Sequence, residues 1–188
     1  YTDAALSAKF VTTNSIQADI TLYAKWTEND APIELGDLGA YYDGLKSLEG
    51  EALKTQLRTL IQKTGTATGS TNQVKEADTY NGSYYLIYNG MGSYGNREHV
   101  WPNSKLGNAP EYDLHNLRAA NTQTNSKRSN HPFTTGTGNW ALKGSAFYPG
   151  DEHVGDVARI VLYIHVRYGL NITLVGNLNM FLEWHQQD

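Results

Sequence analysis

Residues 96–130, NREHVWPNSKLGNAPEYDLHNLRAANTQTNSKRSN, carry the pattern that decides the fold. Residues 97–101 fit a short strand, and Pro102 stops it because proline cannot donate a hydrogen bond to a neighbouring strand. Residues 111–118 alternate loosely between apolar and polar and predict a returning strand. The polar segment 119–128 suits a short helix. The stretch therefore predicts strand, strand and helix in that order.

Several side chains of this stretch fit one kind of chemistry. Glu98 and His99 are neighbours, so they serve one site only if the strand ends there, because neighbours in a strand point to opposite faces. Mg²⁺ accepts carboxylate and amide oxygens, and Asn116 and Asn125 each offer an amide. A neutral histidine can take a proton from water. Spacing alone leaves two interpretations: a metal-dependent phosphodiesterase, or a surface histidine hydrogen-bonded beside an acid.

The rest of the chain predicts the α+β class. Apolar residues at helical spacing predict helices over 40–48, 51–61, 155–170 and 174–185. Residues 64–83 are rich in Thr, Gly, Ser and Asn and predict a loop, and residues 83–89 are typical of a strand. No alternating strand–helix–strand pattern is visible, which argues against a parallel sheet.

Gly90, Gly92 and Gly95 match the spacing G-x-G-x-x-G of dinucleotide-binding loops. That motif works only when a helix follows the glycines, because the helix N-terminus faces the pyrophosphate. The strand-like residues 97–101 and Pro102 follow instead. We interpret the glycines as a flexible connection.

Composition excludes several classes of site. The 188 residues make one domain, or one domain with a short appendage, and no apolar run is long enough to span a membrane. The absence of cysteine excludes disulfides, thiolate-bound metals and a thiol nucleophile. A net charge of −4 argues weakly against a nucleic-acid partner. Residues 97–128, however, hold five basic and three acidic side chains, a local excess of positive charge.

The N-terminal part predicts a separate piece of β structure. Residues 18–26, ADITLYAKW, alternate strictly and predict a half-buried strand. The segment ITLYAKWTE resembles the closing strand of the Listeria–Bacteroides repeat, a small β module of bacterial surface and secreted proteins. The resemblance implies that residues 1–29 are the end of a β repeat module and residues 30–38 a linker. The alternative is an ordinary first strand of the main domain.

Four ordered blocks of the chain resemble the bacterial endonuclease I family. They are YYDGLKSLEGEALKTQLRTLI (41–61), NREHVWPNS (96–104), DLHNLRAANTQTNSKRSN (113–130) and GDVARIVLYIHVRYG (155–169). The resemblance implies an endonuclease I-like domain over residues 39–188, truncated at its C-terminus because the family usually continues. It also implies a ββα-metal (His-Me finger) nuclease core surrounded by helices.

The resemblance assigns catalytic and metal-binding roles by position. His99 resembles the general base that activates water, and Glu111 the carboxylate that orients this base. Glu98 and Asn125 resemble the ligands of Mg²⁺, for which Ca²⁺ and Mn²⁺ are alternatives. Asn116 is expected to brace the turn between the strands through hydrogen bonds from its side chain to the backbone.

Three basic side chains are expected to contact substrate phosphates. They are Lys127, Arg128 and, as a weaker candidate, Arg118. Ser129 stands where many relatives have glycine, a change that is conservative in size.

The sequence as a whole predicts a secreted or cell-surface bacterial enzyme. We expect a monomeric, Mg²⁺-dependent endonuclease of low sequence preference that cleaves DNA, or RNA as an alternative, and leaves 5′-phosphates. A second hypothesis is a surface-attached binding or adhesion module whose nuclease-like domain is inactive. A third is a homing or repair enzyme, although no sequence-reading module is visible.

Overall fold

A computed structural model describes residues 40–65 and 68–187. The chain divides into two compact units, residues 1–47 and 48–188, each of which is described by itself. The described part of the first unit holds the 3₁₀ helix η1 (Ala40–Leu45), which replaces the longer helix expected there. The strand expected over 18–26 and the repeat end expected over 1–29 lie outside the described residues.

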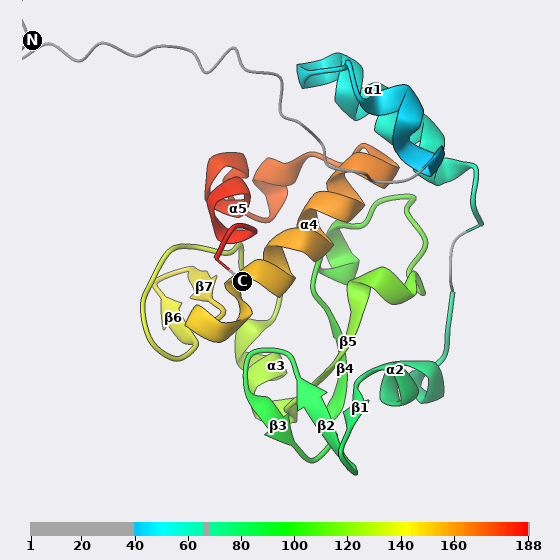
Figure 1. Cartoon of the computed structure of the whole chain (residues 1–188). Coiled ribbons are helices and arrows are strands. Elements are labelled where there is room, and N and C mark those ends of the chain that lie inside the picture. Colours follow the sequence, from blue (N-terminus) through cyan, green and yellow to red (C-terminus); the bar gives the residue numbers. More distant parts are fainter. Residues whose placement is uncertain (1–39, 66–67, 188) are drawn as a thin grey trace, which may run out of the picture. The chain divides into compact units, whose positions relative to one another are not determined.

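Residues 79–120 of the second unit form two small antiparallel sheets (Figure 1). The first holds β1 (Thr79–Tyr80), β2 (Ser83–Leu86) and β3 (Gly90–Gly92) in that order. The second pairs β4 (Asn96–His99) with β5 (Leu117–Ala120). The Ile87 amide donates to the Ala119 carbonyl over 2.9 Å, which links the segment after β2 to β5. Residues 90–92 thus form a strand, not the flexible connection expected from their glycines.

The helix α3 (Thr122–Arg128) follows β5 directly. Its N-cap is Asn121, whose side-chain oxygen accepts hydrogen bonds from the amides of Gln123 and Thr124. The order strand, strand, short helix is therefore the one predicted from residues 96–130.

The returning strand begins later than expected. Residues 111–118 were predicted to be extended, but the 3₁₀ helix η3 (Leu114–Asn116) occupies most of this range and β5 starts at Leu117. The Asp113 carboxylate accepts a hydrogen bond from the His115 amide over 3.0 Å, which favours the turn over extended backbone.

The predicted loop over 64–83 is wrong in its second half, because it contains α2 (Thr71–Ala77) and β1. The Ser70 amide donates to Gln73 Oε1 over 2.6 Å, one half of a capping box. Ser-x-x-Gln is a recognisable helix start, so the sequence did carry a signal for this helix.

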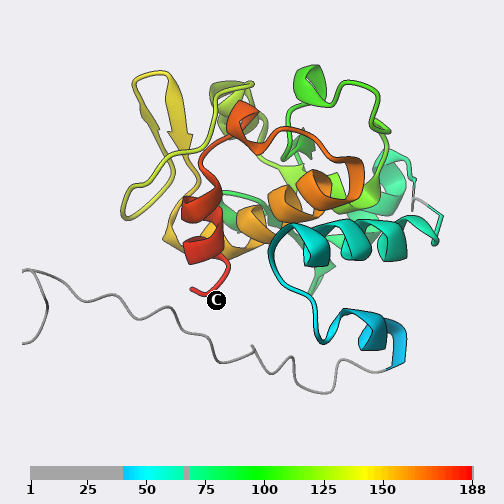
Figure 2. The same cartoon turned by 90° about the horizontal axis from the view of Figure 1, so that it is seen from above.

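Two longer helices and one short helix near the C-terminus complete the unit (Figure 2). They are α1 (Gly50–Gln62), α4 (Val154–Tyr168) and α5 (Leu178–Trp184). The predicted helix over 155–170 is confirmed as α4, whose buried face includes Val157, Val161 and Ile164. Helix α5 is shorter than predicted, because the 3₁₀ helix η5 (Ile172–Leu174) precedes it.

Side chains of α1 donate hydrogen bonds to backbone carbonyls of α4, which holds the two helices together. Arg58 Nε donates to the Val166 carbonyl over 2.6 Å, and Gln62 Nε2 donates to the Arg167 carbonyl over 2.7 Å. Carbonyls near a helix C-terminus lack helical partners, so these bonds satisfy groups that would otherwise need water.

The hairpin β6 (Ala141–Lys143) and β7 (Ala146–Tyr148) packs its Phe147 into the main hydrophobic core. The remaining short elements are the 3₁₀ helices η2 (Asn103–Lys105) and η4 (Asp151–His153). No helix within residues 40–65 and 68–187 is long and apolar enough to cross a membrane. The arrangement confirms the α+β class.

Ser129 ends α3 in a strained backbone conformation. Its φ is 49° and its ψ is −127°, a region that residues with a Cβ rarely adopt and glycine adopts readily. The glycine that the resemblance leads us to expect here therefore matters for backbone freedom more than for size.

We predict that Ser129→Gly raises the free energy of unfolding by about 1 kcal/mol, because the strain is relieved. Ser126→Gly is the matched control: Ser126 is exposed inside α3, where glycine should cost roughly 0.5 kcal/mol. Urea denaturation of both variants measures the difference. A loss of stability in Ser129→Gly would contradict the strain.

Candidate active site

One cavity of about 350 Å³ brings together three of the residues singled out in the sequence. Glu98, His99 and Asn125 all line it, and we call it the His99 cavity. β4 ends at His99, so two neighbouring residues can serve the same cavity. The other lining residues come from the ends of β4 and α3 and from the loop between β4 and β5: Arg97, Pro102, Asn103, Ser104, Ser129 and Asn130.

Glu98 is a buried carboxylate with 3% of its surface exposed. Its Oε1 accepts a hydrogen bond from the Tyr88 hydroxyl over 2.9 Å and lies 3.2 Å from Arg128 Nε, an ion pair without hydrogen-bond geometry. Burial raises the pKa of Glu98 to about 7, against the opposing effect of Arg128. A further positive charge nearby would stabilise the ionised form of this carboxylate.

The Arg128 guanidinium is fully buried. It donates to the carbonyls of Val100 and Ser129 and lies over the Phe133 ring at 4.6 Å from its centroid. These contacts tie the end of α3 to the end of β4.

His99 is held by backbone. Its Nε2 lies 3.0 Å from the carbonyl oxygen of Glu111, so the group of Glu111 that meets the imidazole is the main chain and not the carboxylate. A carbonyl only accepts, so Nε2 carries the proton and a neutral ring has its lone pair on Nδ1. Burial lowers the pKa of His99, which favours the neutral ring.

The amide of Asn125 is oriented by β4. Its Nδ2 donates to Asn96 Oδ1 over 3.0 Å and to the Arg97 carbonyl over 3.3 Å. These bonds use the amino group of Asn125, and the contacts of Glu98 with Tyr88 and Arg128 use Oε1. Asn125 Oδ1 is thus the amide oxygen that remains for a ligand, and the Glu98 carboxylate lines the same cavity.

The donor set of the His99 cavity fits a hard cation such as Mg²⁺. One carboxylate and one amide oxygen, completed by water, are the ligands that Mg²⁺ prefers. Within residues 40–65 and 68–187, no group of three or more His, Cys, Asp or Glu side chains gathers as a metal site. The fit therefore depends on the amide of Asn125 as well as on Glu98.

Asn116 is fully buried and bonds to the backbone of Trp101 in both directions. Its Nδ2 donates to the Trp101 carbonyl over 2.9 Å, and its Oδ1 accepts from the Trp101 amide over 2.7 Å. These two bonds fix the chain just after β4 against the start of β5. Asn116 does not line the His99 cavity.

The structure separates the three side chains expected to bind phosphate. Arg128 is fully buried. Arg118 pairs with Asp78 at 2.9 Å and lines a different cavity. Lys127 is exposed on α3. A phosphate contact of Arg128 or Arg118 stays a prediction.

Sequence reasoning missed two residues of this site. Tyr88 bonds to Glu98 from the segment between β2 and β3, and no spacing pattern connects the two. Arg97 lines the His99 cavity and lies over the Tyr112 ring at 5.2 Å. Its place beside Glu98 in the sequence was the available signal.

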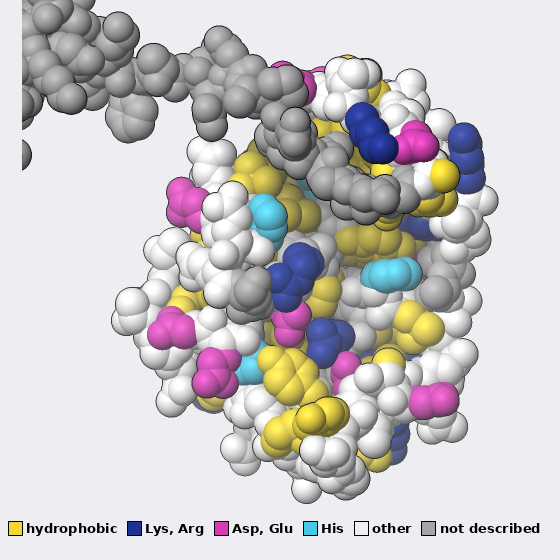
Figure 3. All heavy atoms as spheres, in the orientation of Figure 1, with side chains coloured by type: hydrophobic (Ala, Val, Ile, Leu, Met, Phe, Trp, Pro, Cys, Tyr) yellow, Lys and Arg dark blue, Asp and Glu magenta, His cyan; other side chains and the backbone are white. Residues whose placement is uncertain are grey.

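Figure 3 shows basic side chains interspersed with acidic and apolar ones on the face in view.

Comparisons with known proteins identify the family of the chain. The sequence pattern of the endonuclease I family matches residues 49–188. An extracellular ribonuclease of Bacillus subtilis (strain 168) is 31% identical over an alignment 194 positions long, and the match covers 81% of this chain and 67% of that protein. An extracellular ribonuclease of Bacillus amyloliquefaciens is 34% identical over an alignment 195 positions long, with the same coverage.

We predict that Arg128→Met lowers the free energy of unfolding by about 3–5 kcal/mol, because it leaves the buried Glu98 without its cation. Lys127→Met is the matched control, one residue away but exposed, and should change stability by less than about 0.5 kcal/mol. Urea denaturation at neutral pH measures both. Equal stability of the two variants would show that the buried pair contributes nothing.

Proposed function

Because the chain belongs to the endonuclease I family, and is therefore a phosphodiester-hydrolysing enzyme, we propose that it is a Mg²⁺-dependent endonuclease of low sequence preference. The observation that carries the proposal is the meeting of Glu98, His99 and Asn125 in one cavity. The order β4, β5, α3 around this cavity supports a ββα-metal (His-Me finger) site.

His99 is the proposed general base. Its neutral ring accepts a proton at Nδ1 from the attacking water, while Nε2 keeps its bond to the Glu111 carbonyl. The bond fixes both the tautomer and the direction of the ring, so in this proposal the carbonyl of Glu111 takes the orienting role that the sequence assigns to its carboxylate. The leaving group is the 3′ oxygen, so the products carry 5′-phosphates.

Glu98 and Asn125 are the proposed ligands of the cation. A bound Mg²⁺ supplies charge stabilisation for the phosphate and the leaving oxygen. Arg97 lines the same cavity and is the proposed contact for the scissile phosphate. Lys127, exposed on the helix that carries Asn125, is the proposed contact for a flanking phosphate.

The proposed substrate is nucleic acid outside the cell. The two Bacillus relatives are named extracellular ribonucleases. These names support secretion, and they support testing RNA as well as DNA as the substrate. A net charge of −4 does not oppose this, because attraction of a phosphate depends on the charges at the site.

The main experiment incubates the protein with supercoiled plasmid and with RNA, in Mg²⁺ and in EDTA. We expect cleavage only with Mg²⁺, and a loss of about 10²–10⁴-fold in rate for His99→Ala, because the general base is removed. His185→Ala, an exposed histidine after α5, is the control and should cleave normally. An active His99→Ala would refute the assigned base, and inactivity with every divalent ion would favour the binding module.

A second experiment tests the cation site through Asn125, since changes at Glu98 would also disturb the buried pair. We expect Asn125→Ala to raise the Mg²⁺ concentration for half-maximal cleavage at least about tenfold, and Asn125→Asp to retain binding through its carboxylate. Asn103 lines the same cavity but is not a proposed ligand of the cation, so Asn103→Ala is the control. Calorimetric titration with Mg²⁺ gives a second readout, and equal affinity for all variants would remove Asn125 from the site.

A further inference from the structure

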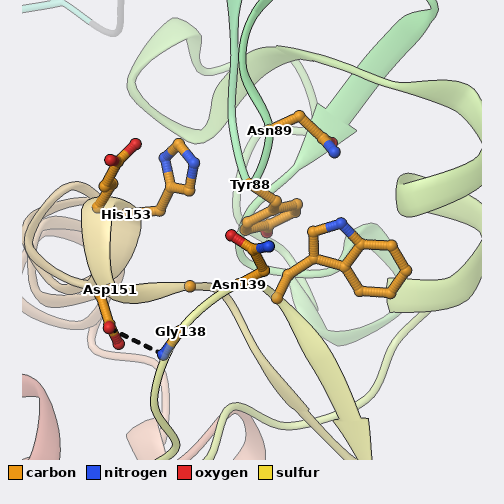
Figure 4. Close-up of a pocket in the computed structure, with 9 residues that line it drawn as sticks. Tyr88, Asn89, Gly138, Asn139, Asp151 and His153 are labelled. Carbon is orange, nitrogen blue, oxygen red and sulfur yellow. Dashed lines mark hydrogen bonds between the residues drawn. The ribbon is translucent and has the colours of Figure 1, made fainter.

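A second cavity of about 350 Å³ lies outside the proposed catalytic site. It is formed by the segment after β2, the loop before β6 and the turn that opens α4, and we call it the Trp140 pocket. Figure 4 shows the imidazole of His153 and the amide of Asn89 on opposite sides of the view, with Tyr88 and Asn139 between them.

The two cavities have no lining residue in common, yet Tyr88 connects them. Tyr88 lines the Trp140 pocket, and its hydroxyl donates to the Glu98 carboxylate that lines the His99 cavity. A ligand in the Trp140 pocket is therefore one side chain away from the proposed cation site.

A rigid aromatic support underlies the pocket. The half-buried indole of Trp140 stacks on the buried Phe147 ring at 5.8 Å with 21° between the planes. Tyr88 meets the same Phe147 edge-on at 5.0 Å. Phe147 therefore supports the indole from the core, and Trp140 also lines the pocket, where it offers an aromatic side chain for a flat ligand to stack on.

Polar side chains that line the pocket can form hydrogen bonds with the edge of such a ligand. Asn89 and Asn139 are exposed, and each amide offers both donors and an acceptor. Glu152 is exposed and offers an acceptor. Asp151 is committed to the fold, because its two oxygens accept hydrogen bonds from the Gly138 amide and the Tyr148 hydroxyl.

The charge of the pocket decides which part of a nucleotide fits. Its lining includes the carboxylates of Asp151 and Glu152 and, among the residues that the structure describes, no Lys or Arg. A phosphate would be repelled there, whereas a nucleobase is flat, uncharged and rich in hydrogen-bonding groups. Aromatic stacking of this kind accepts bases of any sequence.

We propose that the Trp140 pocket binds an unpaired nucleobase of the substrate strand. The choice of ligand rests on the proposed nuclease function. The base stacks on Trp140 and bonds to Asn89, Asn139 or Glu152, while the backbone of the strand runs to the His99 cavity. A base in a duplex is stacked and paired, so the pocket favours single-stranded substrate.

The test measures binding in EDTA, on a His99→Ala background, so that it does not depend on cleavage. Fluorescence anisotropy follows a labelled single-stranded oligonucleotide and an abasic strand of the same length. We expect Trp140→Ala to weaken binding of the base-bearing strand at least about fivefold, and Asn89→Ala to weaken it by a smaller factor. Neither should affect the abasic strand.

Leu142→Ala is the matched control, since Leu142 is 43% exposed on β6 and does not line the pocket. Asn89 is exposed, so its variant keeps the test valid if Trp140→Ala does not fold. The proposal is overturned if the abasic strand binds the parent as tightly as the base-bearing strand, or if both pocket variants bind like the parent. Failure of Mg²⁺-dependent cleavage is a separate result that concerns the His99 cavity.

Discussion

The burial of the Glu98 carboxylate is the constraint on which the rest of the site depends. A desolvated acid is costly unless charge and hydrogen bonds compensate it. Arg128 and Tyr88 supply this compensation from α3 and from the segment after β2. Since Arg128 also bonds to the Val100 carbonyl, the same guanidinium holds α3 against the end of β4. The geometry of the His99 cavity is thus coupled to the electrostatics of one buried ion pair.

Backbone groups contribute to the site as much as side chains do. The Glu111 carbonyl determines which nitrogen of His99 is protonated, and the two bonds between Asn116 and Trp101 keep β4 and β5 in place beneath it. The Arg97 carbonyl and the Asn96 side chain turn the amino group of Asn125 toward β4. Each interaction orients a side chain before any substrate binds, which reduces the entropy lost on binding.

Charge is divided between the two cavities in a way that the net charge conceals. The His99 cavity holds Arg97 beside a site suited to a cation. The Trp140 pocket holds two carboxylates and no Lys or Arg from the described part of the chain. In a nucleic acid, the phosphates suit the His99 cavity and the uncharged bases suit the Trp140 pocket. Tyr88 lies between them, because its ring lines one cavity and its hydroxyl bonds to a wall of the other. Its backbone has a φ of 76°, unusual for a residue with a side chain and costly to keep without such contacts.

The sequence by itself determined the order strand, strand, short helix, the long helix α4 and the three residues that share the His99 cavity. These follow from local periodicity and from the ordered blocks of the family, and the Ser-x-x-Gln signal would have added α2. Only the tertiary structure decided that Arg128 points inward while its neighbour Lys127 is exposed, because neighbours on a helix lie about 100° apart and packing alone selects the buried one. It also decided that Tyr88 meets Glu98 and that the carbonyl of Glu111 lies against the His99 ring. Contacts of this kind depend on how separate segments fold together, and no pattern along the chain encodes them.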